Sequence, residues 1–195
     1  MWNERYSRTE YIYGEEPNKF LEEQLPKVQP GVIIFPCEGE GRNAVFAATL
    51  GWEVLAFDSS EAGKAKAMKL AQMKNVSIDY QIEDANDIEY PDNSADAIAF
   101  IYAHFPTELR NSMLAKANKW LKPGGTIILE AFNPLQLNNT SGGPKDPSFL
   151  YTEEILTNAF PGFEYKILES IKIELNEGAF HQGIADVVRF VGVKG

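Results

Sequence analysis

The feature that most constrains the fold is a regular alternation of short apolar segments with segments of helical pattern. The apolar segments read as buried strands, whereas the others place apolar side chains on one helical stripe. The predicted strands are 32–35, 53–57, 76–82, 95–102 and 126–132, and the predicted helices are 41–50, 60–73 and 107–121, the last with Thr107 as its N-cap. Strands connected through helices form right-handed crossovers, so a parallel sheet with helices on both faces is expected.

The last part of the chain departs from this pattern. Two strand-like segments, 163–175 and 185–194, are separated only by Asn176-Glu177-Gly178, which leaves no room for a crossover helix. A short connection joins antiparallel strands. The expected fold is therefore α/β: a Rossmann-like, doubly wound, seven-stranded and mostly parallel sheet that ends in an antiparallel hairpin. The long stretch 133–148, rich in Pro and Gly, is the kind of loop that usually carries function.

Composition narrows the function. The 195 residues fit one domain, 1–195, and they carry 28 acidic against 18 basic side chains, a formal net charge of −10. This balance opposes binding to nucleic acid and to anionic membranes. No apolar run approaches the roughly 18 residues of a membrane span. The charged start 1–5 gives no secretory signal, and Cys37 is the single cysteine, so a cytoplasmic location is predicted.

The sequence lacks the residue patterns of metal sites, of serine hydrolases and of phosphate-binding loops. Two His and one Cys offer no metal-ligand spacing, so no metal is expected. There is no Gly-x-Ser-x-Gly elbow and no phosphate loop ending in Gly-Lys-Ser/Thr.

A glycine-rich turn follows the first predicted strand. It reads Gly39-x-Gly41-x-x-Ala44, opens a helix, and precedes Asp58 at the end of the second strand. This order is typical of a nucleoside site, in which a strand-end carboxylate accepts from the ribose hydroxyls. The structural alternative is an ordinary tight turn with an Asp that caps the next helix. The three features together favour the nucleoside.

The charge of the turn bears on the ligand. Glu38 and Glu40 would repel a dinucleotide pyrophosphate by roughly 3 kcal/mol per pair, at about 6 Å and an effective dielectric of about 20. The helix dipole returns only about 0.3–1 kcal/mol. A ligand with a sulfonium and an ammonium group is therefore favoured, and a nicotinamide cofactor is the alternative.

In these features the sequence resembles class I S-adenosylmethionine-dependent methyltransferases, in particular the small-molecule branch that includes tellurite-resistance and thiopurine methyltransferase-like proteins. The resemblance covers nearly the whole chain. It is carried by Trp2-Asn3-Glu4-Arg5-Tyr6, Tyr13-Gly14-x-x-Pro17-Asn18-x-Phe20-Leu21, Gly39-Glu40-Gly41-Arg42-Asn43-Ala44, Phe57-Asp58, Asp84-Ala85 and Leu121-Lys122-Pro123-Gly124-Gly125.

The resemblance implies roles at matching positions. Residues 1–30 would form a helical cap over the cofactor, Asp58 would take the ribose hydroxyls, and Asp84 the adenine amine. The full set of implied cofactor-binding residues is Tyr13, Gly39, Glu40, Gly41, Arg42, Asp58, Ser59, Asp84, Ala85, Tyr102 and Ala103. Two departures stand out: Phe35 replaces a frequent acid and Cys37 a frequent glycine. Glu38 or a backbone carbonyl would then receive the ammonium group.

The predicted function is S-adenosylmethionine-dependent methyl transfer to a small-molecule acceptor by in-line displacement. Such a step depends mostly on positioning, and no acid or base is obligatory. His104 and His181 are the catalytic candidates; the alternatives are a structural role at a helix start for His104 and an exposed turn position for His181. An NAD-dependent oxidoreductase and a non-catalytic cofactor-binding protein are the alternative functions.

Overall fold

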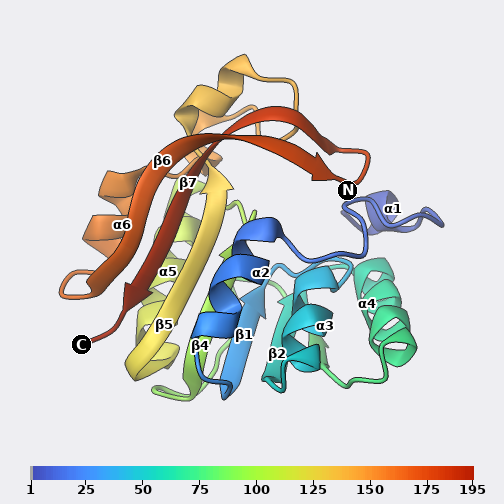
Figure 1. Cartoon of the computed structure of the whole chain (residues 1–195), viewed down its shortest axis with the longest axis horizontal. Coiled ribbons are helices and arrows are strands. Elements are labelled where there is room, and N and C mark those ends of the chain that lie inside the picture. The colour runs from blue at the N-terminus through green and yellow to red at the C-terminus, as the bar shows by residue number, and fades with distance from the viewer. Residues whose placement is uncertain (1) are drawn as a thin grey trace.

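A computed structural model describes residues 2–195 as a seven-stranded sheet between two layers of helices (Figure 1). The strand order is β3-β2-β1-β4-β5-β7-β6. Strands β1 to β5 are parallel, and β7 pairs antiparallel with both β5 and β6. The strands are β1 (Val32–Pro36), β2 (Glu53–Asp58), β3 (Asp79–Ile82), β4 (Ala95–Ile101), β5 (Leu121–Phe132), β6 (Glu164–Glu177) and β7 (His181–Val193). The predicted fold class is confirmed.

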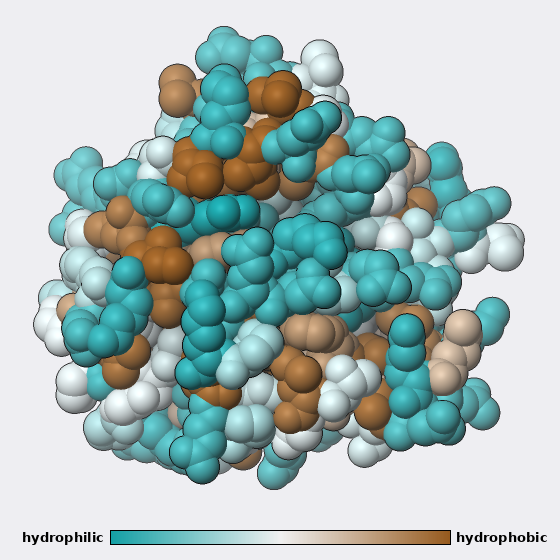
Figure 2. Space-filling view, in the orientation of Figure 1, coloured by the Kyte–Doolittle hydropathy of each residue, from teal (hydrophilic) through white to brown (hydrophobic). Residues whose placement is uncertain are grey.

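Helices cover both faces of the sheet. They are α1 (Trp2–Tyr6), α2 (Lys19–Gln24), α3 (Arg42–Thr49), α4 (Glu61–Met73), α5 (Thr107–Trp120) and α6 (Glu153–Ala159), with short 3-10 helices η1 (Leu25–Lys27), η2 (Pro134–Asn138) and η3 (Pro147–Phe149). No helix within residues 2–195 is both long and apolar enough to cross a membrane. The face seen in Figure 2 is mixed, with hydrophilic side chains between apolar groups near its upper end, on its left side and below its centre.

Alternation along β1 divides the core between the two faces. Ile34 packs into the cluster formed with α5 and α6, whereas Ile33 and Phe35 pack into the cluster formed with α2, α3 and α4. All three side chains are fully buried. A strand buried on both faces reads as a continuous apolar run, which is why this segment was recognisable.

Several predicted boundaries differ from the structure. The N-cap of helix α5 is Pro106, not Thr107 as predicted. The Thr107 hydroxyl donates to the Ser148 carbonyl at 3.3 Å and makes no capping hydrogen bond. Strand β3 begins at Asp79, three residues later than predicted. Strand β5 begins at Leu121, which pairs with Ala95. Helix α6, not anticipated, begins at the Thr152 N-cap, whose side chain accepts from Ile155 N.

The terminal hairpin is longer than predicted and reaches beyond the sheet. Strand β7 begins at His181 rather than at 185, and the hairpin curves over the carboxyl ends of the parallel strands toward α1 (Figure 1). Its tip is joined to the N-terminal segment, because the Ala179 amide donates to the Ile12 carbonyl at 3.1 Å. Gly178 has φ +66°, and a Cβ there would lie 2.2 Å from that same carbonyl oxygen. The hairpin and the N-terminal segment therefore close one side of the molecule together.

Candidate functional site

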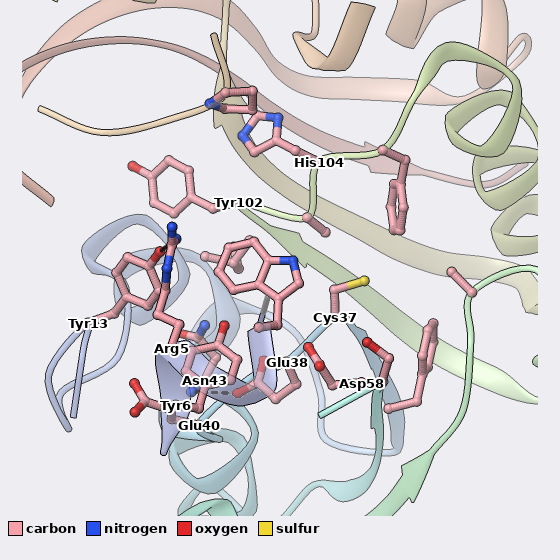
Figure 3. A pocket seen from close by; sticks show the side chains of 18 of the residues that line it. Arg5, Tyr6, Tyr13, Cys37, Glu38, Glu40, Asn43, Asp58, Tyr102 and His104 are labelled. Atoms are coloured by element: carbon pink, nitrogen blue, oxygen red, sulfur yellow. Dashed lines mark hydrogen bonds between the residues drawn. The ribbon is translucent and has the colours of Figure 1, made fainter. Parts of the chain in front are cut away.

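A cavity of about 460 Å³ lies beyond the carboxyl ends of β1, β2 and β4. This is the edge of an open parallel sheet at which ligands bind. Parts of α1, the 143–149 segment and the hairpin contribute to its lining. Figure 3 shows Cys37, Glu38 and Asp58 on one side, with Tyr13, Tyr102 and His104 toward the hairpin.

The glycine turn after β1 is packed closely by other parts of the protein. Tyr6 covers Gly39, where a Cβ would lie 2.7 Å from the Tyr6 hydroxyl oxygen, and the Tyr80 hydroxyl donates to the Gly39 carbonyl at 2.6 Å. Gly41 has φ +87°, and a Cβ there would lie 2.4 Å from that of Ala67 on α4. Neither glycine belongs to the cavity lining. The lack of a side chain at both glycines allows this close packing. Their predicted contact with a cofactor stays a prediction.

Asp58 ends β2 with its carboxylate fixed at the cavity wall. One oxygen accepts from the Gly39 amide at 3.1 Å and the other from the Ser60 amide at 2.9 Å. The side chain is buried, and burial raises its pKa despite these hydrogen bonds. The neighbouring Ser59 also lines the cavity. The arrangement ties the end of β2 to the glycine turn and holds an acceptor group at the cavity wall.

Asp84 and Ala85 line the same cavity beyond the end of β3. Asp84 is exposed, and one of its oxygens accepts from the amide and the side chain of Asn86 at 2.8 and 2.7 Å, which lowers its pKa. Ala85 is buried and offers an apolar surface. The structure thus brings the three predicted positions Asp58, Asp84 and Ala85 to one cavity.

Glu40 and Arg42 line the cavity, but the protein already supplies partners for both. The Glu40 carboxylate accepts from the Ile12 amide at 2.8 Å and forms an ion pair of 2.7 Å with Lys66. Arg42 forms a buried ion pair of 2.8 Å with Glu177 at the end of β6. These contacts hold the N-terminal segment and the hairpin against α3 and α4. The cofactor contact predicted for both residues stays a prediction.

A buried polar network continues from this ion pair. Asn18 donates to Glu130 at 2.7 Å and to Glu177 at 3.1 Å, and Arg189 forms an ion pair of 2.7 Å with Glu130. The Tyr102 hydroxyl donates to Glu130 at 2.8 Å. Sequence reasoning missed this network, because its members lie up to 159 positions apart and no local pattern joins them.

Tyr102 and Ala103 follow β4, which ends at Ile101, one residue earlier than predicted, and both lie beside the cavity. Tyr102 has φ +51°, an uncommon conformation for a non-glycine residue, and it contacts the Phe132 ring at 4.7 Å between centroids. The Ala103 carbonyl accepts from the Tyr151 hydroxyl at 2.9 Å. Both residues belong to the lining.

Three residues of α1, Trp2, Arg5 and Tyr6, also line the cavity, and none of them is among the predicted cofactor-binding residues. The Arg5 guanidinium lies 4.6 Å from the Trp2 ring centroid and donates to the Tyr13 hydroxyl at 3.3 Å. Figure 3 shows Arg5 and Tyr13 side by side. The resemblance implied a helical cap formed by residues 1–30, whereas the aromatic residues of this segment taken alone are more commonly interpreted as simple packing.

His104 uses both ring nitrogens within the protein. Nδ1 donates to the Phe149 carbonyl at 2.9 Å, and Nε2 accepts from the Phe132 amide at 3.4 Å. This pattern requires the neutral ring, and burial lowers the pKa of His104 to about 4. His104 therefore ties the 149 region to β5, although its ring also borders the cavity.

His181 is the first residue of β7 and is only 5% exposed, so the expectation of an exposed turn position was wrong. The reason is that its ring packs among Tyr13, Tyr102 and Phe132 at centroid distances of 4.5, 4.6 and 5.4 Å. Nδ1 has no hydrogen-bond partner and lies 3.6 Å from Glu177 Oε2. Burial lowers the pKa of His181. A mostly buried imidazole whose pKa is lowered thus lines the cavity, with Nδ1 turned toward Glu177.

Glu177 provides a test of the network. Burial alone would raise its pKa, but the neighbouring His181 and Arg42 outweigh burial and lower it to about 2. This stabilisation is complete above pH 4.5 and is lost as the pH falls toward 2. Glu177→Gln is therefore expected to lower the free energy of unfolding by about 2 kcal/mol at pH 7, and by less at pH 3. Urea unfolding at both pH values measures the difference, with Glu174→Gln, on the exposed side of the same strand, as the control. Equal losses at both pH values would contradict the assignment.

Comparison with known proteins agrees with this geometry. Residues 36–125, from the end of β1 into β5, match the Methyltransferase domain family. Phosphoethanolamine N-methyltransferase 1 of Arabidopsis thaliana is 23% identical over 172 residues, which are 88% of this chain and 33% of that protein. The chain thus spans about a third of the length of this curated relative.

Solved structures show the same fold. TehB from Haemophilus influenzae has a TM-score of 0.74 and 18% identity, with 100% of this chain and 66% of TehB covered. Magnesium protoporphyrin IX methyltransferase from Synechocystis PCC 6803, with SAH bound, has a TM-score of 0.67 and 16% identity, covering 90% and 80% of the two chains. No group of three or more metal-ligating side chains is arranged for a metal ion anywhere in residues 2–195. The matched segment and the strand order agree: residues 36–125 resemble the Methyltransferase domain family, and the fold is the one seen in these solved methyltransferase structures.

Proposed function

We propose that the protein transfers a methyl group from S-adenosylmethionine to a small-molecule acceptor. The observation that carries this proposal is the Asp58 carboxylate, which is fixed by two backbone amides at the wall of the cavity. A carboxylate held in this way accepts hydrogen bonds from the two ribose hydroxyls without further rearrangement. The methyltransferases found by comparison support this function over a nicotinamide-dependent oxidoreductase.

The residues present fit the proposed cofactor. Beside Asp58, the Phe57, Ala85 and Leu109 side chains supply an apolar surface for a flat base, and Asp84 supplies an acceptor for its amine. The volume of about 460 Å³ lies in the usual range for small-ligand sites. When bound, the cofactor supplies an electrophilic methyl group on a positively charged sulfur.

The hairpin side of the cavity suits the acceptor. Its lining includes Phe132, Pro144 and Phe149, so it excludes water from the reacting groups. The Tyr13 and Tyr102 rings offer electron-rich faces that attract a sulfonium. The chain therefore contributes orientation and desolvation, which an in-line displacement requires. We propose that an acceptor with an apolar body and one nucleophilic atom occupies this side.

His181 is the proposed proton acceptor for that nucleophile, because its ring lines the cavity and burial favours the neutral form. Nδ1 is buried 3.6 Å from the Glu177 carboxylate, so the proposed acceptor atom is Nε2. His181→Asn is expected to lower kcat about 100-fold for a hydroxyl or amine acceptor, and to change the affinity for S-adenosylhomocysteine less than threefold. The matched control is His104→Asn, which removes a ring that already has two partners. The His104→Asn variant should be less stable, but its rate should still fall at acidic pH, where the proton acceptor becomes protonated. If this fall in rate were lost in His104→Asn and kept in His181→Asn, the role of His181 would be contradicted.

The function is tested by incubating the protein with methyl-labelled S-adenosylmethionine and a panel of thiols, phenols, amines and carboxylic acids. Acceptor-dependent formation of S-adenosylhomocysteine supports the proposal. Cofactor binding without transfer to any member of the panel would favour a non-catalytic binding protein. The cytoplasmic location predicted from the sequence stays a prediction.

A further inference from the structure

The acidic side chains that line the cavity all lie at one end of it. They come from the ends of three neighbouring strands: Glu38 and Glu40 follow β1, Asp58 ends β2, and Glu83 and Asp84 follow β3. The lining that comes from the end of β4, from β5 and from the hairpin contains no acid within residues 2–195. A negatively charged ligand group would therefore be repelled at the β1–β3 end and not at the hairpin end.

Two arginines line the cavity, and they differ in their partners. Arg42 forms a buried ion pair of 2.8 Å with Glu177. Arg5, on α1, forms no ion pair with any acid in the described part of the chain. Its guanidinium makes one hydrogen bond there, to the Tyr13 hydroxyl at 3.3 Å. A guanidinium has five N–H donors, so Arg5 keeps its charge and most of its donors for a ligand.

Aromatic side chains hold the Arg5 guanidinium on the hairpin side of the cavity. Its Cζ lies 4.6 Å from the centroid of the Trp2 ring and 5.4 Å from that of the Phe180 ring. Phe180 immediately precedes His181, and Tyr13, which lies beside Arg5 in Figure 3, contacts the His181 ring at 4.5 Å between centroids. These cation–π contacts position the charge without neutralising it. The unpaired cation therefore belongs to the end of the cavity that has no acid.

Resting on the proposed function, we propose that Arg5 binds a carboxylate group of the methyl acceptor. The acceptor is then an apolar carboxylic acid whose methylated atom is a separate hydroxyl, thiol or amine. A guanidinium holds a carboxylate through two parallel hydrogen bonds, which orient the bound molecule as well as retain it. A single guanidinium matches the single charge of a carboxylate better than the roughly two charges of a phosphate.

The first measurement compares acids with their amides on protein saturated with S-adenosylhomocysteine. The probes are 4-methoxybenzoate, cinnamate and indole-3-acetate, each with the amide of the same shape, and titration calorimetry gives their affinities. An amide keeps the apolar body and the carbonyl oxygen but carries no charge. At least one acid is expected to bind about 20-fold more tightly than its amide.

Three variants assign this preference to one side chain. Arg5→Gln removes the charge and keeps a donor for Tyr13, so the preference should disappear while the affinities for S-adenosylhomocysteine and for the amides change less than threefold. Arg5→Lys keeps the charge without the paired donors, and should retain a preference of about threefold. Arg8→Gln is the matched control, because Arg8 is exposed, lies 6.0 Å from the centroid of the same Phe180 ring and is not part of the lining. It should keep the full preference.

An equal loss of the preference in Arg8→Gln would show a general effect of charge and would overturn the assignment of Arg5. The assignment is also overturned if no acid binds better than its amide, or if Arg5→Gln weakens S-adenosylhomocysteine and leaves the preference intact. Failure of the proposed function is seen separately, because wild-type protein that does not bind S-adenosylhomocysteine fails before any acid is added.

Discussion

Asp58→Ala is expected to weaken S-adenosylhomocysteine binding by about 100-fold or more. The carboxylate would accept from both ribose hydroxyls, and each hydrogen bond to a charged group contributes about 1.5–3 kcal/mol. The substitution also removes the acceptors of the Gly39 and Ser60 amides, which loosens the turn that lines the cavity. Titration calorimetry at pH 7.5 measures the change.

Asp96→Ala is the matched control. This acid lies at the opposite end of the sheet, where it accepts from the Val32 amide at 2.8 Å and pairs with Lys122 at 2.8 Å. The substitution Asp96→Ala therefore removes a carboxylate acceptor that lies away from the cavity, so the affinity for S-adenosylhomocysteine should be unchanged. Equal affinities of the wild-type protein and Asp58→Ala for S-adenosylhomocysteine would contradict the role of Asp58.

Gly41→Ala is expected to give a large loss of stability, about 3 kcal/mol. The residue has φ +87°, which costs an L residue about 1–2 kcal/mol. The new Cβ would also lie 2.4 Å from the Ala67 Cβ, and the overpacking adds about 1–3 kcal/mol. Thermal unfolding should show the midpoint lowered by about 10 °C.

Gly51→Ala separates the two contributions. Gly51 has φ +89°, and nothing lies within 4 Å of a Cβ built there. This variant should lose only about 1 kcal/mol, the conformational part. Losses of the same size at both positions would show that the close approach of α3 to α4 is not what requires glycine at Gly41.

The parallel part of the fold could be predicted because local patterns determine it. Strand β1 is buried on both faces and reads as an apolar run, and the predicted helix 60–73 is α4, whose N-cap Ser60 accepts from Gly63 N at 3.0 Å. The cluster of Asp58, Asp84 and Ala85 followed from the rule that parallel strands present their carboxyl ends at one edge.

The hairpin side could not be predicted in the same way. His181 is buried because the β6–β7 ladder continues to Glu177 and His181 and places the ring against Tyr13 and Tyr102. Arg42 finds its partner in Glu177, 135 positions away. Contacts of this kind depend on how far a twisted hairpin extends, and no local pattern in the sequence specifies that length.

The acids of the glycine turn illustrate the same limit. The sequence indicated that Glu38 and Glu40 favour a cationic ligand, and the resemblance named Glu38 for the ammonium group, but neither indicated which protein groups each carboxylate contacts. In the structure, Glu40 anchors Ile12 and Lys66, whereas Glu38 holds the start of α3 and keeps one oxygen free. Their roles depend on partners in the N-terminal segment, in α3 and in α4.

A crystal structure with S-adenosylhomocysteine tests the central claim most directly. The account predicts both ribose hydroxyls within about 2.5–3.0 Å of the Asp58 oxygens, with the base between Phe57 and Leu109. A ligand bound elsewhere, or an adenosine whose hydroxyls face away from Asp58, would contradict it.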